Sequence, residues 1–208
     1  VPDGARVLLL GSFPPPHARW SMEFFYPNFQ NDMWRIMGLL FYGDAGHFVM
    51  PGQKRFDYER VVEFCRREGI ALYDAAYMVK RLRGNASDNF LKIIEPTDIP
   101  ALLARMPSCR AVVSTGGKSA EQIASILDVP VPSVGGSVPF IISAPSTFSA
   151  LSAASVPSAT STSSDSTASS ASGVSSRTVT FYRMPSSSRA YPLSLEKKAA
   201  AYARIFGL

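Results

Sequence analysis

The sequence predicts an α/β fold, a three-layer sandwich in which helices flank a central four-stranded, mostly parallel sheet. Two observations support this prediction. Four short apolar runs have the composition of buried strands, and amphipathic patterns with a period of about 3.6 residues lie between them. Strands that alternate with helices are typical of a parallel sheet whose two faces are both covered. The 208 residues are enough for one domain of this kind.

The predicted strands are short apolar runs at residues 6–10, 70–73, 110–115 and 177–182. The predicted helices repeat apolar residues three or four positions apart, over residues 31–41, 57–68, 99–106, 118–127 and from Ser194 onward. Thr97 and Asp98 have the character of a helix N-cap before residue 99. In the last helix one side is apolar, with Leu195, Ala199, Tyr202 and Phe206 along it.

A low-complexity segment at about residues 143–176 interrupts this pattern. Its 34 residues include 15 serines, 7 alanines and 4 threonines, and Asp165 is its only charged residue. Such a segment buries too little apolar surface to offset the entropy of ordering it. We therefore predict a single domain over residues 1–208 that carries a disordered insertion in a surface hairpin or loop. A phosphorylated or glycosylated stalk is the alternative.

The composition limits the partners of the protein. Its formal net charge of +5 suits a polyanion such as nucleic acid, although a merely soluble basic surface explains the charge equally well.

Cys65 and Cys109 have neither metal-binding nor redox spacing, which predicts reduced cysteines in an intracellular protein. Its compartment would be cytoplasmic in a prokaryote and nuclear or organellar in a eukaryote. No apolar run approaches the length of a membrane span. We expect a monomer with no metal, no cofactor and no membrane contact.

A loop rich in aromatic and proline residues follows the first predicted strand, over residues 11–34. It contains Trp20, Phe24, Phe25 and Tyr26, which is more aromatic residues than a connection needs. In open α/β sheets, ligands bind outside the carboxyl ends of the strands. The loop is therefore a candidate site for a flat, planar ligand.

A second candidate site lies between the third predicted strand and the next helix, in residues 114–119. Exposed N–H groups around Gly116 at a helix N-terminus attract phosphate, and Lys118 adds positive charge. The segment lacks the spacing of a P-loop, so we do not expect it to bind a nucleoside triphosphate. A plain glycine turn is the alternative.

Four segments, spread over most of the chain, fall at the ends of successive predicted strands. They read GSFP at residues 11–14, YPNFQNDMW at 26–34, GIALYD at 69–74 and MPSSS at 184–188. In their order and spacing they resemble the uracil-DNA glycosylase superfamily, and most closely its hypoxanthine-DNA glycosylase-like branch. The resemblance implies an enzyme that flips a base out of DNA and removes it by hydrolysis without a metal. The chain also lacks the cysteine and histidine set of a zinc deaminase.

In this branch the resemblance implies that Asn31 is catalytic, and that its amide orients water or hydrogen-bonds the substrate. The alternative is that Asn31 only caps the helix that follows it, and the two roles are compatible. Many relatives carry asparagine or aspartate two residues after the first glycine, where this chain has Phe13. We therefore expect a slow or narrow activity.

The resemblance also implies that the first loop holds the flipped base. Tyr26 matches the aromatic residue that stacks under the base, and Phe25 is its nearest substitute. The backbone N–H groups of Ser12 and Phe13 match groups that bind a base carbonyl. Stacking on one aromatic side chain is worth about 1–3 kcal/mol. The alternative is that Tyr26 and Phe25 anchor the loop to the core.

The loop before the last helix matches the segment that presses on the DNA backbone in the family. Ser186, Ser187 and Ser188 would approach phosphates closely, and Arg189 would fill the gap that the flipped base leaves. An ordinary turn rich in serine and proline is the alternative. The loop has no histidine, whereas the most efficient uracil enzymes carry one here, and this again predicts a low rate.

The residues and the resemblance together predict a monofunctional DNA glycosylase of base-excision repair. It would remove hypoxanthine or uracil from DNA that contains a damaged or mismatched base. A catalytically weak or inactive nucleic-acid-binding relative of the same fold is the first alternative, favoured by the missing carboxylate after Gly11. A nucleosidase that acts on small molecules is the second.

Overall fold

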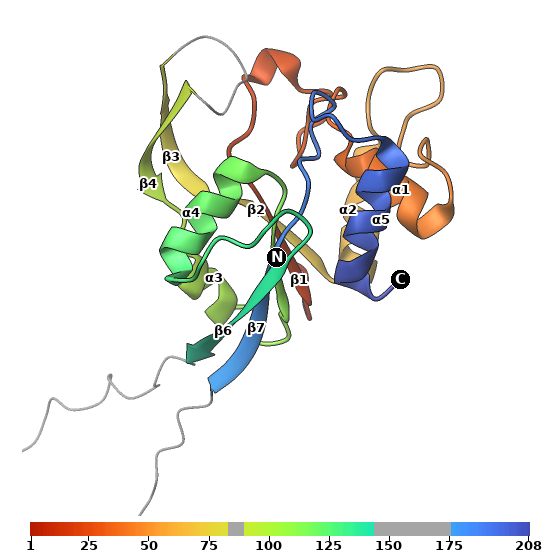
Figure 1. The fold of residues 1–208 in the computed structure, drawn as a ribbon. Coiled ribbons are helices and arrows are strands. Elements are labelled where there is room, and N and C mark those ends of the chain that lie inside the picture. Colours follow the sequence, from red (N-terminus) through yellow and green to blue (C-terminus); the bar gives the residue numbers. More distant parts are fainter. Residues whose placement is uncertain (83–89, 144–175) are drawn as a thin grey trace, which may run out of the picture.

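The computed structural model describes residues 1–82, 90–143 and 176–208, and its central sheet has five strands in the order β2-β1-β5-β7-β6 (Figure 1). The strands are β1 (Val7–Gly11), β2 (Ile70–Asp74), β5 (Ala111–Ser114), β6 (Ser137–Ser143) and β7 (Ser176–Arg183). β1, β2, β5 and β7 are parallel, and β6 runs antiparallel to β7. The predicted α/β fold with a mostly parallel sheet is confirmed.

The sheet has one strand more than the four predicted from the sequence. The additional strand, β6, lies at the edge of the sheet and alternates between exposed and half-buried residues. Pro139 interrupts its apolar run, and a proline within such a run argues against a strand unless the strand lies at an edge. The sequence pattern therefore did not identify β6.

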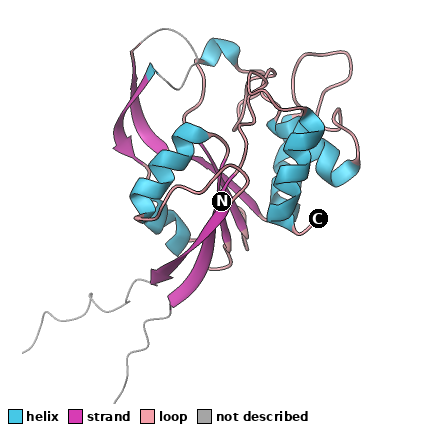
Figure 2. Cartoon of the chain, viewed as in Figure 1, coloured by secondary structure: helices cyan, strands magenta, loops and turns pink. Residues whose placement is uncertain are grey.

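Helices cover both faces of the sheet, as Figures 1 and 2 show. One hydrophobic cluster contains residues of α1 (Met33–Tyr42), α2 (Tyr58–Glu68) and α5 (Leu195–Phe206), and a second contains residues of α3 (Ile99–Ala104) and α4 (Gly117–Leu127). The side chains of β1 are divided between the clusters: Val7 and Leu9 join the first, and Leu8 and Leu10 join the second. Because successive side chains of a strand point to opposite faces, a strand in this position needs an unbroken apolar run.

Side chains cap α3 and α5 where the sequence predicts that these helices start. The Asp98 carboxylate accepts the Ala101 N–H at 2.9 Å, which confirms the predicted N-cap of α3. The Ser194 hydroxyl accepts the Lys197 N–H at 3.4 Å at the start of α5. Such caps satisfy N–H groups that have no partner within the first turn of the helix.

A separate two-stranded antiparallel sheet, which the sequence did not predict, follows β2. It consists of β3 (Ala76–Arg81) and β4 (Leu91–Pro96), and the pairing shifts register on either side of Met78. In Figure 1 this β3–β4 hairpin stands apart from the central sheet, above α4. Many residues of the hairpin are exposed, so its sequence lacks the continuous apolar run of a buried strand.

The remaining predictions concern the Ser-rich segment, the cysteines and membranes. The Ser-rich segment lies outside the described residues, apart from its ends Ser143 and Ser176, which pair in the β6–β7 ladder. Cys65 and Cys109 are both free and buried, and burial raises the pKa of the Cys65 thiol to about 12, so this thiol stays protonated near neutral pH. None of the helices within the described ranges combines the length and the apolar character needed to span a bilayer.

Candidate active site

A groove of about 1100 Å³ lies at the carboxyl ends of the parallel strands. Its lining comes from the last residue of β1 and the loop that follows it (residues 11–31), the start of α4, and the loop between β7 and α5. Asp74, the last residue of β2, also borders the groove. The parallel strands thus bring segments that are far apart in the sequence to one edge of the sheet, where ligands bind in open α/β folds.

Ten of the eleven predicted site residues line this groove. They are Ser12, Phe13, Phe25, Tyr26, Asn31, Gly116, Ser186, Ser187, Ser188 and Arg189. The eleventh, Lys118, lies on the first turn of α4 and borders a smaller pocket between α4 and the β3–β4 hairpin. Its Nζ lies 3.8 Å from the Glu121 carboxylate. Lys118 is therefore near the groove but not part of its lining.

Close packing around Gly11 brings an aspartate and a tyrosine together. A Cβ atom at Gly11 would lie 2.9 Å from Asp74 Oδ1 and 3.6 Å from the Tyr26 hydroxyl, so the missing side chain makes room for both groups. The Tyr26 hydroxyl also forms a 3.0 Å hydrogen bond with the Thr115 hydroxyl. Burial raises the pKa of Tyr26, the bond to Thr115 lowers it in part, and the charge of Asp74 raises it further. The tyrosine hydroxyl is therefore neutral at physiological pH.

Phe13, Phe25 and Tyr26 form what we call the aromatic wall of the groove. Tyr26 meets the buried Trp34 edge to face with ring centroids 6.3 Å apart, and Phe25 lies 6.3 Å from Tyr73. Tyr26 has a φ of +51°, a left-handed conformation that costs a non-glycine residue about 1–3 kcal/mol. Tyr26 and Phe25 both line the groove and pack against the core, so the structure is compatible with both sequence interpretations.

Asn31 lies where the first loop enters α1. Its Oδ1 accepts the N–H of Met33, the first residue of α1, at 2.9 Å, although Asp32 and not Asn31 occupies the N-cap position. The backbone of Asn31 forms an antiparallel bridge with Ser188, which joins the first loop to the loop between β7 and α5. Among residues 1–82, 90–143 and 176–208, the Asn31 Nδ2 group has no hydrogen-bond partner, which leaves two N–H donors for a ligand or a water.

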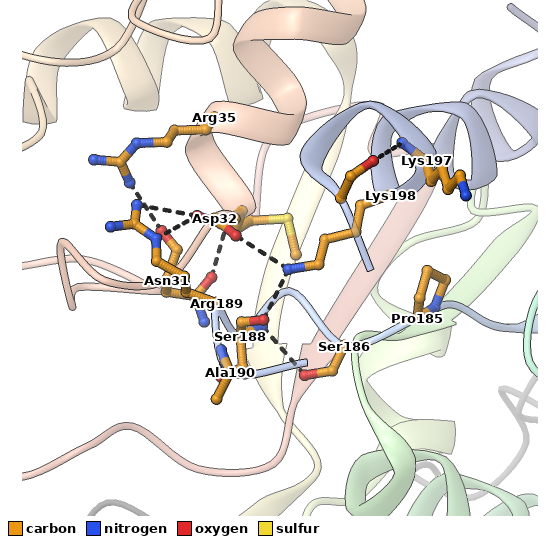
Figure 3. A network of polar contacts seen from close by, with 12 residues as sticks. Asn31, Asp32, Arg35, Pro185, Ser186, Ser188, Arg189, Ala190, Lys197 and Lys198 are labelled. Atoms are coloured by element: carbon orange, nitrogen blue, oxygen red, sulfur yellow. Dashed lines mark hydrogen bonds and ion pairs between the residues drawn. The ribbon is translucent and has the colours of Figure 1, made fainter. Parts of the chain in front are cut away.

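Asn31 and residues 186–189 form a second wall, which we call the ion-pair wall because buried charges support it (Figure 3). Asp32, 7% exposed, accepts the Lys198 Nζ at 3.0 Å through one carboxylate oxygen and Arg189 at 3.1 Å through the other. Lys198 is 1% exposed and also donates to the Ser188 carbonyl at 2.8 Å. Because an unpaired buried charge is strongly unfavourable, Asp32 and Lys198 hold α1, α5 and the loop between β7 and α5 together.

The loop between β7 and α5 is fixed on both sides of Ser187. The Ser187 N–H donates to the Thr115 carbonyl at 3.3 Å, and the Ser187 carbonyl accepts the Asp32 N–H at 2.8 Å. Ser187 is only 2% exposed, whereas Ser186 is half-buried and Ser188 is exposed. The predicted phosphate contacts therefore fit Ser186 and Ser188 better than they fit Ser187.

Arg189 has a side chain that is 48% exposed and that pairs with Asp32. Figure 3 shows its guanidinium beside the carboxylate, on the side away from Lys198. Since Lys198 pairs with the other oxygen, Arg189 can leave Asp32 without leaving this carboxylate unpaired. The predicted insertion of Arg189 into the gap left by a flipped base requires such a movement.

Four residues of this site received no individual role in the sequence prediction: Asp32, Asp74, Thr115 and Lys198. Thr115 lies in the candidate segment 114–119, and Asp32 and Asp74 lie in segments that carry the resemblance. Lys198 does carry a signal, because it lies three residues after Leu195 and four before Tyr202, on the apolar side of the last helix. A lysine is almost never fully buried unless it is paired, so this position indicates a buried partner. Asp32 carries no comparable signal, because aspartate is common at helix starts.

The described residues contain no group of three or more histidine, cysteine, aspartate and glutamate side chains placed to hold a metal ion. The polar groups that border the groove are hydroxyls, amides, backbone N–H groups, arginines and the carboxylates of Asp74 and Glu23. Together with the aromatic wall, these groups can stack on a planar ligand, donate and accept hydrogen bonds at its edge, and bind anions.

Comparisons with known proteins identify a similar fold. No protein-family model matches the chain, and no curated protein matches it. Among solved structures, the solution NMR structure of a "putative Uracil DNA glycosylase" from Methanosarcina acetivorans is similar, with a TM-score of 0.57 and 17% sequence identity. The match covers 100% of this chain and 94% of that chain. At this identity the comparison shows that the two chains share a fold.

Proposed function

We propose that this protein is a DNA glycosylase that binds a deaminated base, hypoxanthine or uracil, in the groove and hydrolyses its bond to deoxyribose. The observation that supports this most is that Asn31, Tyr26 and residues 186–188 border one cavity at the carboxyl ends of the strands. Base excision needs a pocket for the flipped base and, beside it, groups that contact the DNA backbone. The fold shared with the Methanosarcina acetivorans protein agrees with this function.

In this proposal the base lies between the aromatic wall and Asp74. The ring of Tyr26 or Phe25 supplies a stacking face worth about 1–3 kcal/mol. Asp74 would supply the acceptor, because a carboxylate that has lost its proton only accepts hydrogen bonds. Hypoxanthine and uracil carry a ring N–H where adenine and cytosine carry an acceptor nitrogen, so an acceptor at this place favours the deaminated bases. The backbone N–H groups of Ser12 and Phe13 would bind a carbonyl of the base.

Asn31 acts as a hydrogen-bond donor in the proposed reaction. Because its Oδ1 is bonded to the Met33 N–H, its Nδ2 group is the part that it offers to the attacking water or the sugar. A donor holds a water but cannot take its proton. Of the two carboxylates that border the groove, Glu23 is exposed and pairs with His17 at 2.9 Å, and Asp74 is assigned to the base. The absence of a carboxylate assigned to the water supports a slow reaction.

The DNA backbone would lie along the ion-pair wall. Ser186 and Ser188 offer hydroxyl groups to phosphates, and the start of α4 at Gly116 offers N–H groups. Arg189 would leave Asp32 to fill the gap in the duplex. Lys118 would contact a phosphate outside the groove.

Single-turnover assays with the protein in excess over duplexes that contain inosine, uracil or mismatched thymine test this function. We expect abasic product from the inosine or uracil duplex and none from the same duplex with normal bases. Binding without product on all three duplexes would instead identify a nucleic-acid-binding relative, which Phe13 in place of a carboxylate favours. Competition by undamaged duplex DNA for the protein tests the nucleosidase alternative. Phosphate contacts release counterions, so competition that depends on them falls steeply as the salt concentration rises. Such a salt dependence would argue against a nucleosidase that acts on small molecules.

A further inference from the structure

The β3–β4 hairpin is attached to the rim of the groove. The Ala76 N–H at the start of β3 donates to the Ser12 carbonyl at 3.4 Å. The Arg81 guanidinium at the other end of β3 donates to the Pro14 carbonyl and lies 5.9 Å from the centre of the Phe13 ring. Both ends of β3 therefore contact residues 12–14, which line the groove, and the hairpin lies beside this rim. Figure 1 shows the hairpin standing apart from the central sheet.

The hairpin has an inner face that packs toward α4. Val79, Leu91 and Ile93 border a small pocket together with Ser119 and Gln122 of α4. Val79 and Ile93 are opposite each other in the two strands, as are Arg81 and Leu91. Because side chains alternate along a strand, the residues between these positions point to the opposite, outer face.

The outer face carries two like charges side by side. Lys80 and Lys92 are direct partners in the β3–β4 register, and both are exposed. Like charges directly opposite each other in a sheet are destabilising. Within the part of the chain that the structure describes, neither lysine forms an ion pair. The hairpin therefore keeps a positive pair that an external anion would neutralise.

Exposed apolar side chains accompany the two lysines. Met78 is 49% exposed, Ile94 is 52% exposed and Tyr77 is 59% exposed. The alternative is that the two lysines only prevent the exposed strand edges of the hairpin from associating with other strands. That role does not explain the exposed apolar side chains on the same hairpin. A partner that presents both negative charge and apolar surface accounts for both features, and the sugar–phosphate backbone of DNA is such a partner.

We propose that the outer face of the β3–β4 hairpin, with Lys80 and Lys92 at its centre, binds the sugar–phosphate backbone of duplex DNA that flanks the flipped nucleotide. The inference rests on the proposed function for the identity of the polyanion, and it adds a second DNA contact outside the groove. Phosphate contacts position a protein on DNA without reading sequence. The hairpin therefore increases affinity for damaged and undamaged duplexes alike.

The salt dependence of binding to an undamaged duplex tests this contact. Each phosphate contact adds about 0.9 to the slope of log affinity against log salt concentration. We expect Lys80→Ala/Lys92→Ala to reduce the magnitude of this slope by about 2. Lys80→Arg/Lys92→Arg keeps both charges and is expected to keep the slope.

Arg105→Ala/Arg110→Ala is the matched control. It also removes two exposed positive charges, but at the end of α3 and just before β5, where the amino ends of the strands lie. We expect it to leave the slope unchanged. Equal slopes for the wild type and Lys80→Ala/Lys92→Ala would overturn the inference, and so would a wild-type protein that does not bind duplex DNA.

Base excision measured on the same variants separates this inference from the proposed function. With DNA saturated by protein, we expect Lys80→Ala/Lys92→Ala to form abasic product at the wild-type rate. Excision without a slope change would refute the hairpin contact alone. A slope change in a protein that excises no base would refute the proposed function and leave the hairpin contact standing.

Discussion

The two walls of the groove are held by different kinds of interaction. The aromatic wall rests on ring contacts with the core and on the Tyr26–Thr115 hydrogen bond. The ion-pair wall depends on two buried charged residues, Asp32 and Lys198. Aromatic contacts contribute about 0.5–1.5 kcal/mol each and are spread over several residues. A buried ion pair concentrates its effect in two side chains, so we expect the ion-pair wall to be far more sensitive to single substitutions.

The largest effect is expected for Lys198→Met, which keeps an apolar stem of similar length but removes the charge. The variant leaves Asp32 without its buried partner and the Ser188 carbonyl without its donor. We expect the free energy of unfolding in urea to fall by about 3–5 kcal/mol. Lys197→Met changes the exposed neighbour on the same helix, and we expect it to cost less than about 0.5 kcal/mol. Equal losses for both variants would mean that the buried pair does not hold this wall.

Asp74→Asn tests the acceptor that the end of β2 contributes to the groove. If the carboxylate accepts the ring N–H of a deaminated base, its loss removes a charge-assisted hydrogen bond worth about 1.5–3 kcal/mol. We expect the excision rate at limiting protein to fall by about 10- to 100-fold. The control is Glu23→Gln, at the exposed acidic residue of the groove, for which we expect a change of less than about twofold. If the two variants behave alike, Asp74 does not bind the base.

A smaller effect is expected for Tyr26→Phe in the aromatic wall. The substitution removes the hydroxyl that bonds Thr115 and keeps the ring. Thr115 retains its bond to the Leu10 carbonyl, so no buried donor is left unpaired. We expect a loss of about 1 kcal/mol in the free energy of unfolding. A loss as large as that of Lys198→Met would contradict the difference between the walls.

The smallest effect on stability is expected for Arg189→Ala. This side chain is half exposed, and Lys198 still pairs with Asp32 when it is absent. Exposed ion pairs contribute about 0–1 kcal/mol, and we expect a loss in this range from chemical denaturation. Arg189→Lys, which keeps the charge, serves as its control. A loss above about 2 kcal/mol would mean that both cations are needed to hold Asp32.

The sequence revealed features that are continuous along the chain and missed those that only the fold assembles. The buried strands β1 and β5 are visible as continuous apolar runs. The edge strand β6 alternates between exposed and half-buried residues and carries a proline, and many residues of the β3–β4 hairpin are exposed, so these strands were missed. The aromatic wall is visible because its residues cluster within one loop. The ion-pair wall joins Asp32 to Lys198, which are 166 positions apart. Only the fold brings these two residues together, and neither has a neighbour in the sequence that reveals the other.

The most direct test of the proposed site is the single-turnover rate of Asn31→Ala on the duplex, inosine or uracil, that the wild type cleaves. Removing a positioned donor typically lowers a rate by about 100-fold or more, and we expect a loss of this size with binding to undamaged duplex unchanged. Asn28→Ala, at another asparagine that borders the groove, is the control and is expected to stay within about twofold of the wild type. A wild-type rate for Asn31→Ala would contradict the assignment of the reaction to this groove.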